Sequence, residues 1–176
     1  MFPECDDARL YAGLLADQNS LVHDFIARQK VGGTHLKYHV KKQITNLPPS
    51  AYTEADLAYI VPRVLELTYT SHDLAPWAAD LGHTGAPFGF DPTRRAMLRA
   101  ELDAYYARLY GLTRDELRYI LDPSDTHGAD YPSETFRGLK NNDIKAHGDY
   151  RTRRLVLAAY DELVARGMRP RTEGWR

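Results

Sequence analysis

The feature that most constrains the fold of this chain is the helical periodicity of residues 91–111, DPTRRAMLRAELDAYYARLYG. An Asp-Pro pair opens the segment and Gly111 closes it, which is typical of the start and the end of an α-helix. Apolar residues recur between them at the spacing that places side chains on one helical face: Met97, Leu98, Leu102, Tyr105 and Leu109. The segment therefore predicts a long amphipathic helix that packs against a hydrophobic core.

Similar helical patterns cover most of the remaining chain. Thr53 followed by Asp56, and Thr113 followed by Glu116, have the spacing of a helix capping box. Pro62 falls inside the pattern that follows Thr53, and we expect it to kink that helix or to begin a new one. The patterned segments are residues 6–18, 19–30, 53–71, 113–123 and 149–167. The sequence therefore predicts a mainly α fold, a helical domain.

Residues 34–47, THLKYHVKKQITNL, depart from this helical pattern. Two sets of side chains alternate weakly here: apolar Leu36, Tyr38 and Val40, and polar Lys37, His39 and Lys41. Because such alternation is typical of a strand, we expect a small β element near residues 35–45, ended by Pro48-Pro49. These prolines also mark an expected boundary between residues 1–50, with two helices, a Gly-Gly turn and a short strand, and a helical region at 51–176.

The overall composition gives little indication of a partner. The net charge of −1 over 176 residues provides no global electrostatic case for nucleic acid or for a membrane surface. Cys5 is the single cysteine, which excludes a disulfide framework and a cysteine-based metal site. The N-terminus lacks the pattern of a signal peptide, and no apolar run approaches ~20 residues. We therefore expect a cytoplasmic protein with no membrane contact.

Catalytic motifs are not found in the sequence. It contains no glycine-rich phosphate loop, no GxSxG elbow and no HExxH pattern. The run NLPPS at 46–50 is not the Asn-Pro-Pro-aromatic motif of amino-methyltransferases, because Leu47 interrupts it and Ser50 replaces the aromatic residue. The paired acids are expected in first turns or on exposed faces of helices: Glu54 and Asp56, Glu101 and Asp103, Asp115 and Glu116. We predict a non-catalytic chain that holds no cofactor or metal of its own.

Two stretches concentrate positive charge. Residues 28–49 hold five lysines and arginines and no acid, and residues 137–154 hold six basic residues against two acidic ones. Basic side chains beside a Gly-Gly turn can contact phosphates, although such runs are commonly solvated faces. The candidate nucleic-acid-binding residues are Arg28, Lys30, Gly32, Gly33, Thr34, His35, Lys37, Lys41 and Lys42.

The first stretch, in its context, resembles a known family. LLADQNSLVHDFIARQKVGGTHLKYHVKKQITNLPP, residues 14–49, looks like the end of the specificity domain of TaqI-like adenine-specific DNA methyltransferases and related single-chain type II restriction–modification enzymes. The matching features are Asn19-Ser20, Phe25, the turn Gly32-Gly33-Thr34 and Leu47-Pro48-Pro49. The later runs LDAYYARLYGLTRDELRYILD and GDYRTRRLVLAAYD resemble the helical tail of the same enzymes.

The resemblance implies a role in DNA recognition. It covers about residues 10–165 and does not include the methylase motifs that bind cofactor and carry out catalysis. It therefore implies a non-catalytic target-recognition module for double-stranded DNA, which works with a methylase domain or subunit that uses S-adenosylmethionine. The alternatives are a helical module that docks on a methylase or nuclease partner with little DNA contact, and a stand-alone enzyme.

Overall fold

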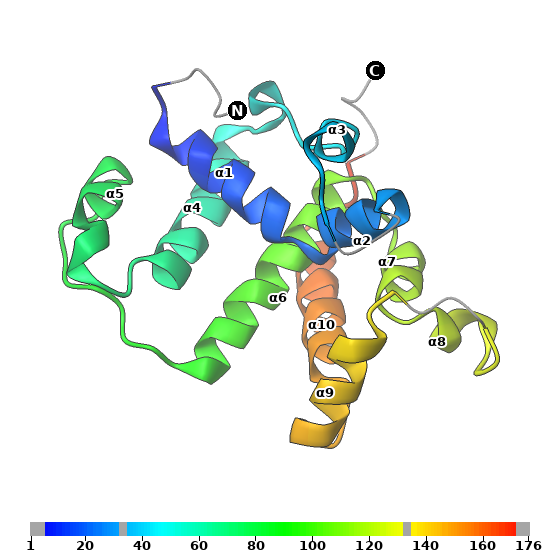
Figure 1. Ribbon diagram of the computed structural model, residues 1–176. Coiled ribbons are helices and arrows are strands. Elements are labelled where there is room, and N and C mark those ends of the chain that lie inside the picture. The colour runs from blue at the N-terminus through cyan, green and yellow to red at the C-terminus, as the bar shows by residue number, and fades with distance from the viewer. Residues whose placement is uncertain (1–5, 32–34, 132–134, 172–176) are drawn as a thin grey trace.

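The computed structural model describes residues 6–31, 35–131 and 135–171 of the chain (Figure 1). Within these ranges the backbone forms ten α-helices and no strand. The first five are α1 (Ala8–Asn19), α2 (Leu21–Lys30), α3 (Tyr38–Lys41), α4 (Glu54–Thr68) and α5 (Ala75–Asp80). The others are α6 (Pro92–Leu109), α7 (Arg114–Leu121), α8 (Pro123–His127), α9 (Arg137–His147) and α10 (Arg151–Ala165). Short 3-10 helices cover Pro49–Ala51 and His72–Leu74. The predicted mainly α fold is confirmed.

Helix α6 runs through the middle of the molecule and organises the packing. It contacts α10 along much of its length and also packs against α4 and α2 (Figure 1). Its side chains Tyr105, Tyr106 and Leu109 are fully buried, so the segment with the strongest helical pattern forms the centre of the core. No described helix is both long enough and apolar enough to cross a membrane.

The predicted helix starts at Thr53 and Thr113 are confirmed. Each threonine side chain accepts a hydrogen bond from the backbone N–H three residues later, and the side chain of Asp56 or Glu116 accepts one from the threonine N–H in return. This reciprocal box satisfies N–H groups that have no partner inside a helix. Helix α4 continues through Pro62 as one element.

The expected β element near residues 35–45 is wrong. Lys37 begins a single helical turn, in which its carbonyl accepts hydrogen bonds from the N–H groups of Val40 and Lys41, and Lys42 N–H donates to the Tyr38 carbonyl. A strand needs a neighbouring strand to pair its backbone groups, and none lies in the described part of the chain. Local helical bonds satisfy the same groups without a partner, which explains why the turn forms.

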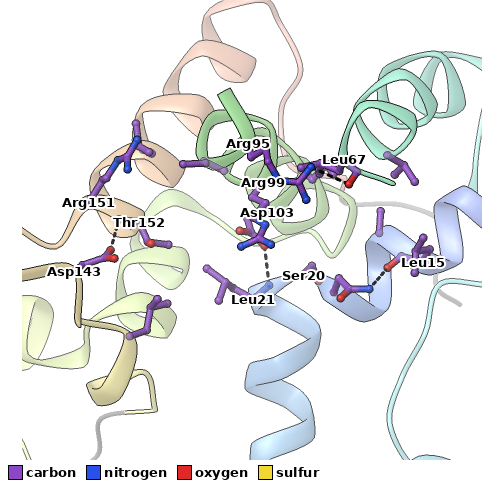
Figure 2. A pocket seen from close by; sticks show the side chains of 18 of the residues that line it. Leu15, Ser20, Leu21, Leu67, Arg95, Arg99, Asp103, Asp143, Arg151 and Thr152 are labelled. Atoms are coloured by element: carbon purple, nitrogen blue, oxygen red, sulfur yellow. Dashed lines mark hydrogen bonds between the residues drawn. The ribbon is translucent and has the colours of Figure 1, made fainter. Parts of the chain in front are cut away.

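Two buried aspartates hold the N-terminal helices against α6. Asp103 accepts a hydrogen bond of 2.8 Å from the backbone N–H of Leu21, the first residue of α2 (Figure 2). Asp17, at the end of α1, accepts one of 2.8 Å from the Leu47 N–H and one of 2.9 Å from the Tyr110 hydroxyl. Asp56 is buried as well. The expectation of a first turn or an exposed face is therefore wrong for Asp103, which is buried in α6, and confirmed for Asp56, which lies in the first turn of α4.

One core cluster includes residues from both sides of Pro48. Ala12, Val22 and Leu47 precede the prolines, and they belong to the same buried cluster as Leu57 and Val156, which follow them. The division into residues 1–50 and 51–176 stays a prediction.

Candidate nucleic-acid interface

The candidate interface is the exposed segment 35–43, which contains α3 and connects α2 to the 3-10 turn at Pro49. The segment holds Lys37, Lys41 and Lys42 and no acidic residue. Nearly all of its side chains are exposed, including Tyr38 at 61%. The chain turns back into the protein at Ile44 and Leu47, both of which are buried. The sequence therefore presents a short, positively charged segment between two buried anchors.

Hydrogen bonds at the end of this segment fix its position. Leu47 N–H donates to the buried carboxylate of Asp17, and the Tyr110 hydroxyl lies 3.3 Å from the Thr45 carbonyl oxygen, to which it donates. Burial lowers the pKa of His23 in α2, and the nearby charge of Lys41 lowers it further, against the opposing effects of Asn46 and Asp24. The positive charge of Lys41 therefore acts on His23 in the first turn of α2.

The three lysines of the segment carry positive charge that other side chains do not neutralise. Lys37, Lys41 and Lys42 form no ion pair with any residue in the described ranges. The Lys42 ammonium lies 4.5 Å from the ring centroid of Tyr38, a cation–π contact that leaves the charge exposed to solvent. These lysines have the exposure and the charge that contacts with a phosphate backbone require.

The predicted residues on α2 contribute less charge. Arg28 forms an ion pair with Asp24, with an Nε–Oδ1 distance of 2.9 Å, and its guanidinium lies 5.5 Å from the Phe136 ring centroid. Lys30 is exposed at the last position of α2, and His35 is exposed at the start of the segment. Gly32, Gly33 and Thr34 lie outside the described residues. The structure thus brings the three segment lysines and His35 together and leaves Arg28 paired on the adjoining helix.

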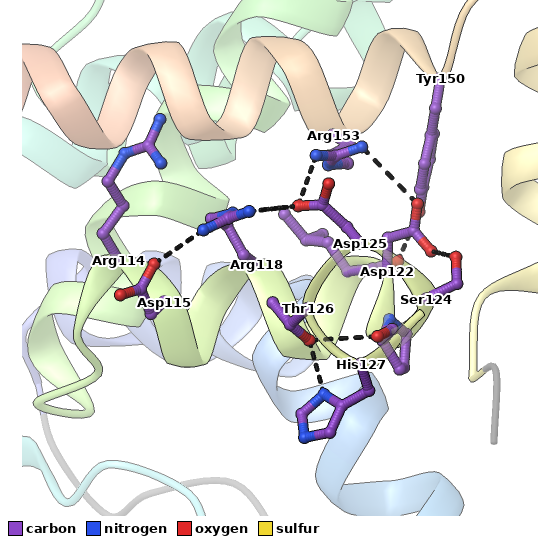
Figure 3. Close-up of polar contacts among 12 residues, drawn as sticks. Arg114, Asp115, Arg118, Asp122, Ser124, Asp125, Thr126, His127, Tyr150 and Arg153 are labelled. Carbon is purple, nitrogen blue, oxygen red and sulfur yellow. Dashed lines mark hydrogen bonds and ion pairs between the residues drawn. The ribbon is translucent and has the colours of Figure 1, made fainter. Parts of the chain in front are cut away.

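In the second basic stretch, residues 137–154, at least three of the six basic residues form ion pairs. Lys140 lies 3.0 Å from Asp122, and Arg153 lies 2.6 Å from Asp125, which also pairs with Arg118 (Figure 3). Arg154 pairs with Asp149 inside the stretch at 2.6 Å. The excess of basic residues in the sequence therefore does not become an equal excess of free charge on the surface.

Sequence reasoning missed the exposure of Tyr38. The sequence pattern groups Tyr38 with the apolar residues Leu36 and Val40 of the expected strand, and the tyrosines of the long amphipathic helix, Tyr105 and Tyr106, are buried in the core. Tyr38 differs in standing between Lys37 and His39, in a stretch without an apolar helical stripe. These polar neighbours were the sequence feature from which the exposure of Tyr38 could have been predicted. An exposed ring beside lysines can stack on a sugar or a base while the lysines contact phosphates.

The described residues offer no metal site, because no three His, Cys, Asp or Glu side chains among them gather closely enough to hold an ion. Comparison of the chain with family models, with curated proteins and with solved structures finds no match.

Proposed function

We propose that this chain is a non-catalytic DNA-binding module and that segment 35–43 lies against the phosphate backbone of double-stranded DNA. The observation that carries the proposal is the set of three exposed lysines without an ion pair in a segment without acids. In a chain with a net charge of −1, such a concentration of free positive charge favours an anionic partner at this place.

The resemblance to TaqI-like methyltransferases supports the same proposal. It covers about residues 10–165, which include the lysine segment, and it suggests target recognition within a modification or restriction–modification system of the cytoplasm. The chemistry would belong to a methylase domain or subunit that binds S-adenosylmethionine. This chain would contribute contacts with the DNA, and methyl transfer is not assigned to it.

The proposal is tested by titrating a fluorescent DNA duplex with the protein at several salt concentrations. Each phosphate contact contributes a slope of about −0.9 to the plot of log affinity against log salt. The double variant Lys41→Glu, Lys42→Glu should therefore bind at least about tenfold more weakly and show a salt slope shallower by about two. The loss should be similar for duplexes of different sequence, since phosphates carry no sequence information.

The matched control is the double variant Lys145→Glu, Arg154→Glu in the second basic stretch, which changes the net charge by the same amount. Both residues are exposed. This variant should retain most of the affinity. Equal losses in the two variants would show that binding depends on net charge and not on segment 35–43. Absence of duplex binding by the unaltered chain at low salt would refute the proposal.

A further inference from the structure

A groove lies between α6 and the junction of α1 and α2 (Figure 2). Its volume is about 670 Å³. Six helices enclose it: the end of α1, the start of α2, the end of α4, the first part of α6, one face of α9 and the start of α10. The DNA proposal does not use any of the residues that line it.

The walls of the groove are mainly apolar. Leucines from six helices line it: Leu15 of α1, Leu21 of α2, Leu67 of α4, Leu102 of α6, Leu139 of α9 and Leu155 of α10. Leu15 is 41% exposed, which is high for a leucine on a well-packed helix. Burial of such a surface by a partner is favourable, since each Å² of apolar surface removed from water contributes about 25 cal/mol.

The two acidic side chains in the groove accept hydrogen bonds from backbone N–H groups of the protein. Asp103 is buried and accepts the Leu21 N–H at the start of α2. Asp143 of α9 accepts the Thr152 N–H in the first turn of α10 at 2.7 Å. Both carboxylates face helix N-termini, where negative charge is stabilised by unpaired N–H groups and the helix dipole. Each carboxylate therefore already accepts a hydrogen bond from within the protein.

The three arginines of the groove remain available to bind the carboxylates of a partner. Arg99 of α6 is exposed and forms no hydrogen bond or ion pair with a described residue, although its charge is near enough to Asp103 to lower the pKa of that carboxyl. Arg95, one turn earlier, donates to the Leu67 carbonyl, which leaves its positive charge without a carboxylate. Arg151 of α10 has a contact of 3.5 Å with the His147 ring and no carboxylate partner in the described ranges. The groove thus combines apolar walls with a rim of three arginines that form no ion pair with a described carboxylate (Figure 2).

We infer that this groove docks an amphipathic helix of a partner protein, with an apolar face that meets the leucines and carboxylates that meet Arg95, Arg99 and Arg151. A helix is the favoured form because a partner strand needs a free sheet edge, and the described part of the chain has no strand. A nucleic acid is disfavoured because its phosphates would not fill a leucine-lined groove. This surface is separate from segment 35–43 and does not depend on DNA binding.

The probe is a fluorescein-labelled synthetic helix of about five turns, with leucines at positions i, i+3, i+4 and i+7 flanked by glutamates. Fluorescence anisotropy with the full chain should show saturable binding. A peptide with glutamine in place of each glutamate should bind about tenfold more weakly, and one with serine in place of each leucine should not bind. Equal binding of the serine peptide would overturn the proposal, because it would indicate attraction by charge alone. No binding of the acidic leucine peptide would also overturn it.

The protein variant that tests the groove is Arg99→Glu, which places a like charge against the peptide. It should weaken binding of the acidic peptide at least about tenfold, equivalent to about 1.4 kcal/mol. Arg166→Glu is the matched control, since Arg166 is exposed at the end of α10 and changes the net charge equally. Because Arg99 is exposed, unfolding of the variant is not expected, and its circular dichroism should match that of the unaltered chain. Equal weakening by both variants would contradict the proposal.

The two proposals can fail separately. Lys41→Glu, Lys42→Glu should leave peptide binding unchanged, and Arg99→Glu should leave duplex binding unchanged. A duplex that competes fully with the acidic peptide would show that both occupy one surface, and that result would overturn the assignment of the groove to a protein partner.

Discussion

Asp56 shows how much a single residue can hold together in this protein. Its carboxylate accepts hydrogen bonds from the Thr53 N–H and hydroxyl, from the Tyr105 hydroxyl at 2.7 Å, from Arg108 at 2.8 Å and from Arg171 at 2.6 Å. Burial by itself raises the pKa of Asp56, but the hydrogen bonds from Thr53, Arg171 and Tyr105 outweigh it and lower the pKa to about 2. One carboxylate thus joins the start of α4, the C-terminal end of α6 and the C-terminal segment.

We therefore expect Asp56→Ala to lower the free energy of unfolding by about 3 kcal/mol or more, because it leaves two partly buried arginines without their counter-charge. Glu54→Ala is the matched control two residues earlier, in the same first turn. Glu54 pairs with Arg9 at an exposed site, so its loss should cost less than about 1 kcal/mol. Urea unfolding measures both, and similar losses would contradict the assigned role of Asp56.

At the scale of the element, α4 contains a proline that disfavours the helix, and the packing of the helix compensates for it. Pro62 lies inside the helix and has no N–H to donate to the Ala58 carbonyl. The neighbouring residues Ile60, Val61, Val64 and Leu65 are buried, while Pro62 faces solvent. The apolar face therefore stabilises a helix that the proline disfavours, as is expected when tertiary packing outweighs propensity.

Pro62→Ala should for this reason stabilise the protein. The gain in helix propensity is about 3 kcal/mol, and the greater freedom of the unfolded chain offsets about 1 kcal/mol of it. We expect a net gain of about 1–2 kcal/mol, seen as a higher midpoint of urea unfolding. Pro92→Ala, at the first position of α6 where a proline is favourable, should give no gain. A gain at Pro92 equal to that at Pro62 would contradict the explanation.

At the scale of the whole molecule, buried carboxylates make stability depend on pH in two opposite ways. Burial raises the pKa of Asp103 to about 7 and that of Asp17 to about 6, although hydrogen bonds from Leu21, Leu47 and Tyr110 partly oppose it. A raised pKa favours folding below the unfolded value of 3.8, and that contribution is lost as pH rises towards 6 and 7. The lowered pKa of Asp56 acts the other way, and its contribution is lost as pH falls from about 4 to 2.

We therefore expect the free energy of unfolding to fall by a few kcal/mol between about pH 4 and pH 7, since each unit of pKa shift corresponds to about 1.4 kcal/mol. Asp103→Asn keeps an oxygen for the Leu21 N–H and removes the charge, so it should flatten this slope. Thermal unfolding at a series of pH values measures it. A variant with the same slope as the unaltered chain would contradict the assignment to Asp103.

The sequence alone determined the features that depend on neighbours along the chain. The helical class, the capping boxes at Thr53 and Thr113, and the limits of α6 all follow from contacts within a few residues, where spacing and residue type fix the geometry. It also located the lysines of segment 35–43, because their concentration is a property of the sequence itself.

The tertiary structure decided what depends on distant residues. Alternation over a few positions could not show that segment 35–43 is a helical turn, because a strand is defined by a partner elsewhere. Composition could not show that Asp122 and Asp125 neutralise Lys140 and Arg153, since these pairs join separate helices. Nor could a pattern show that Asp103 is buried against Leu21, because a carboxylate becomes stable in a core only when a folded neighbour presents an N–H group to it.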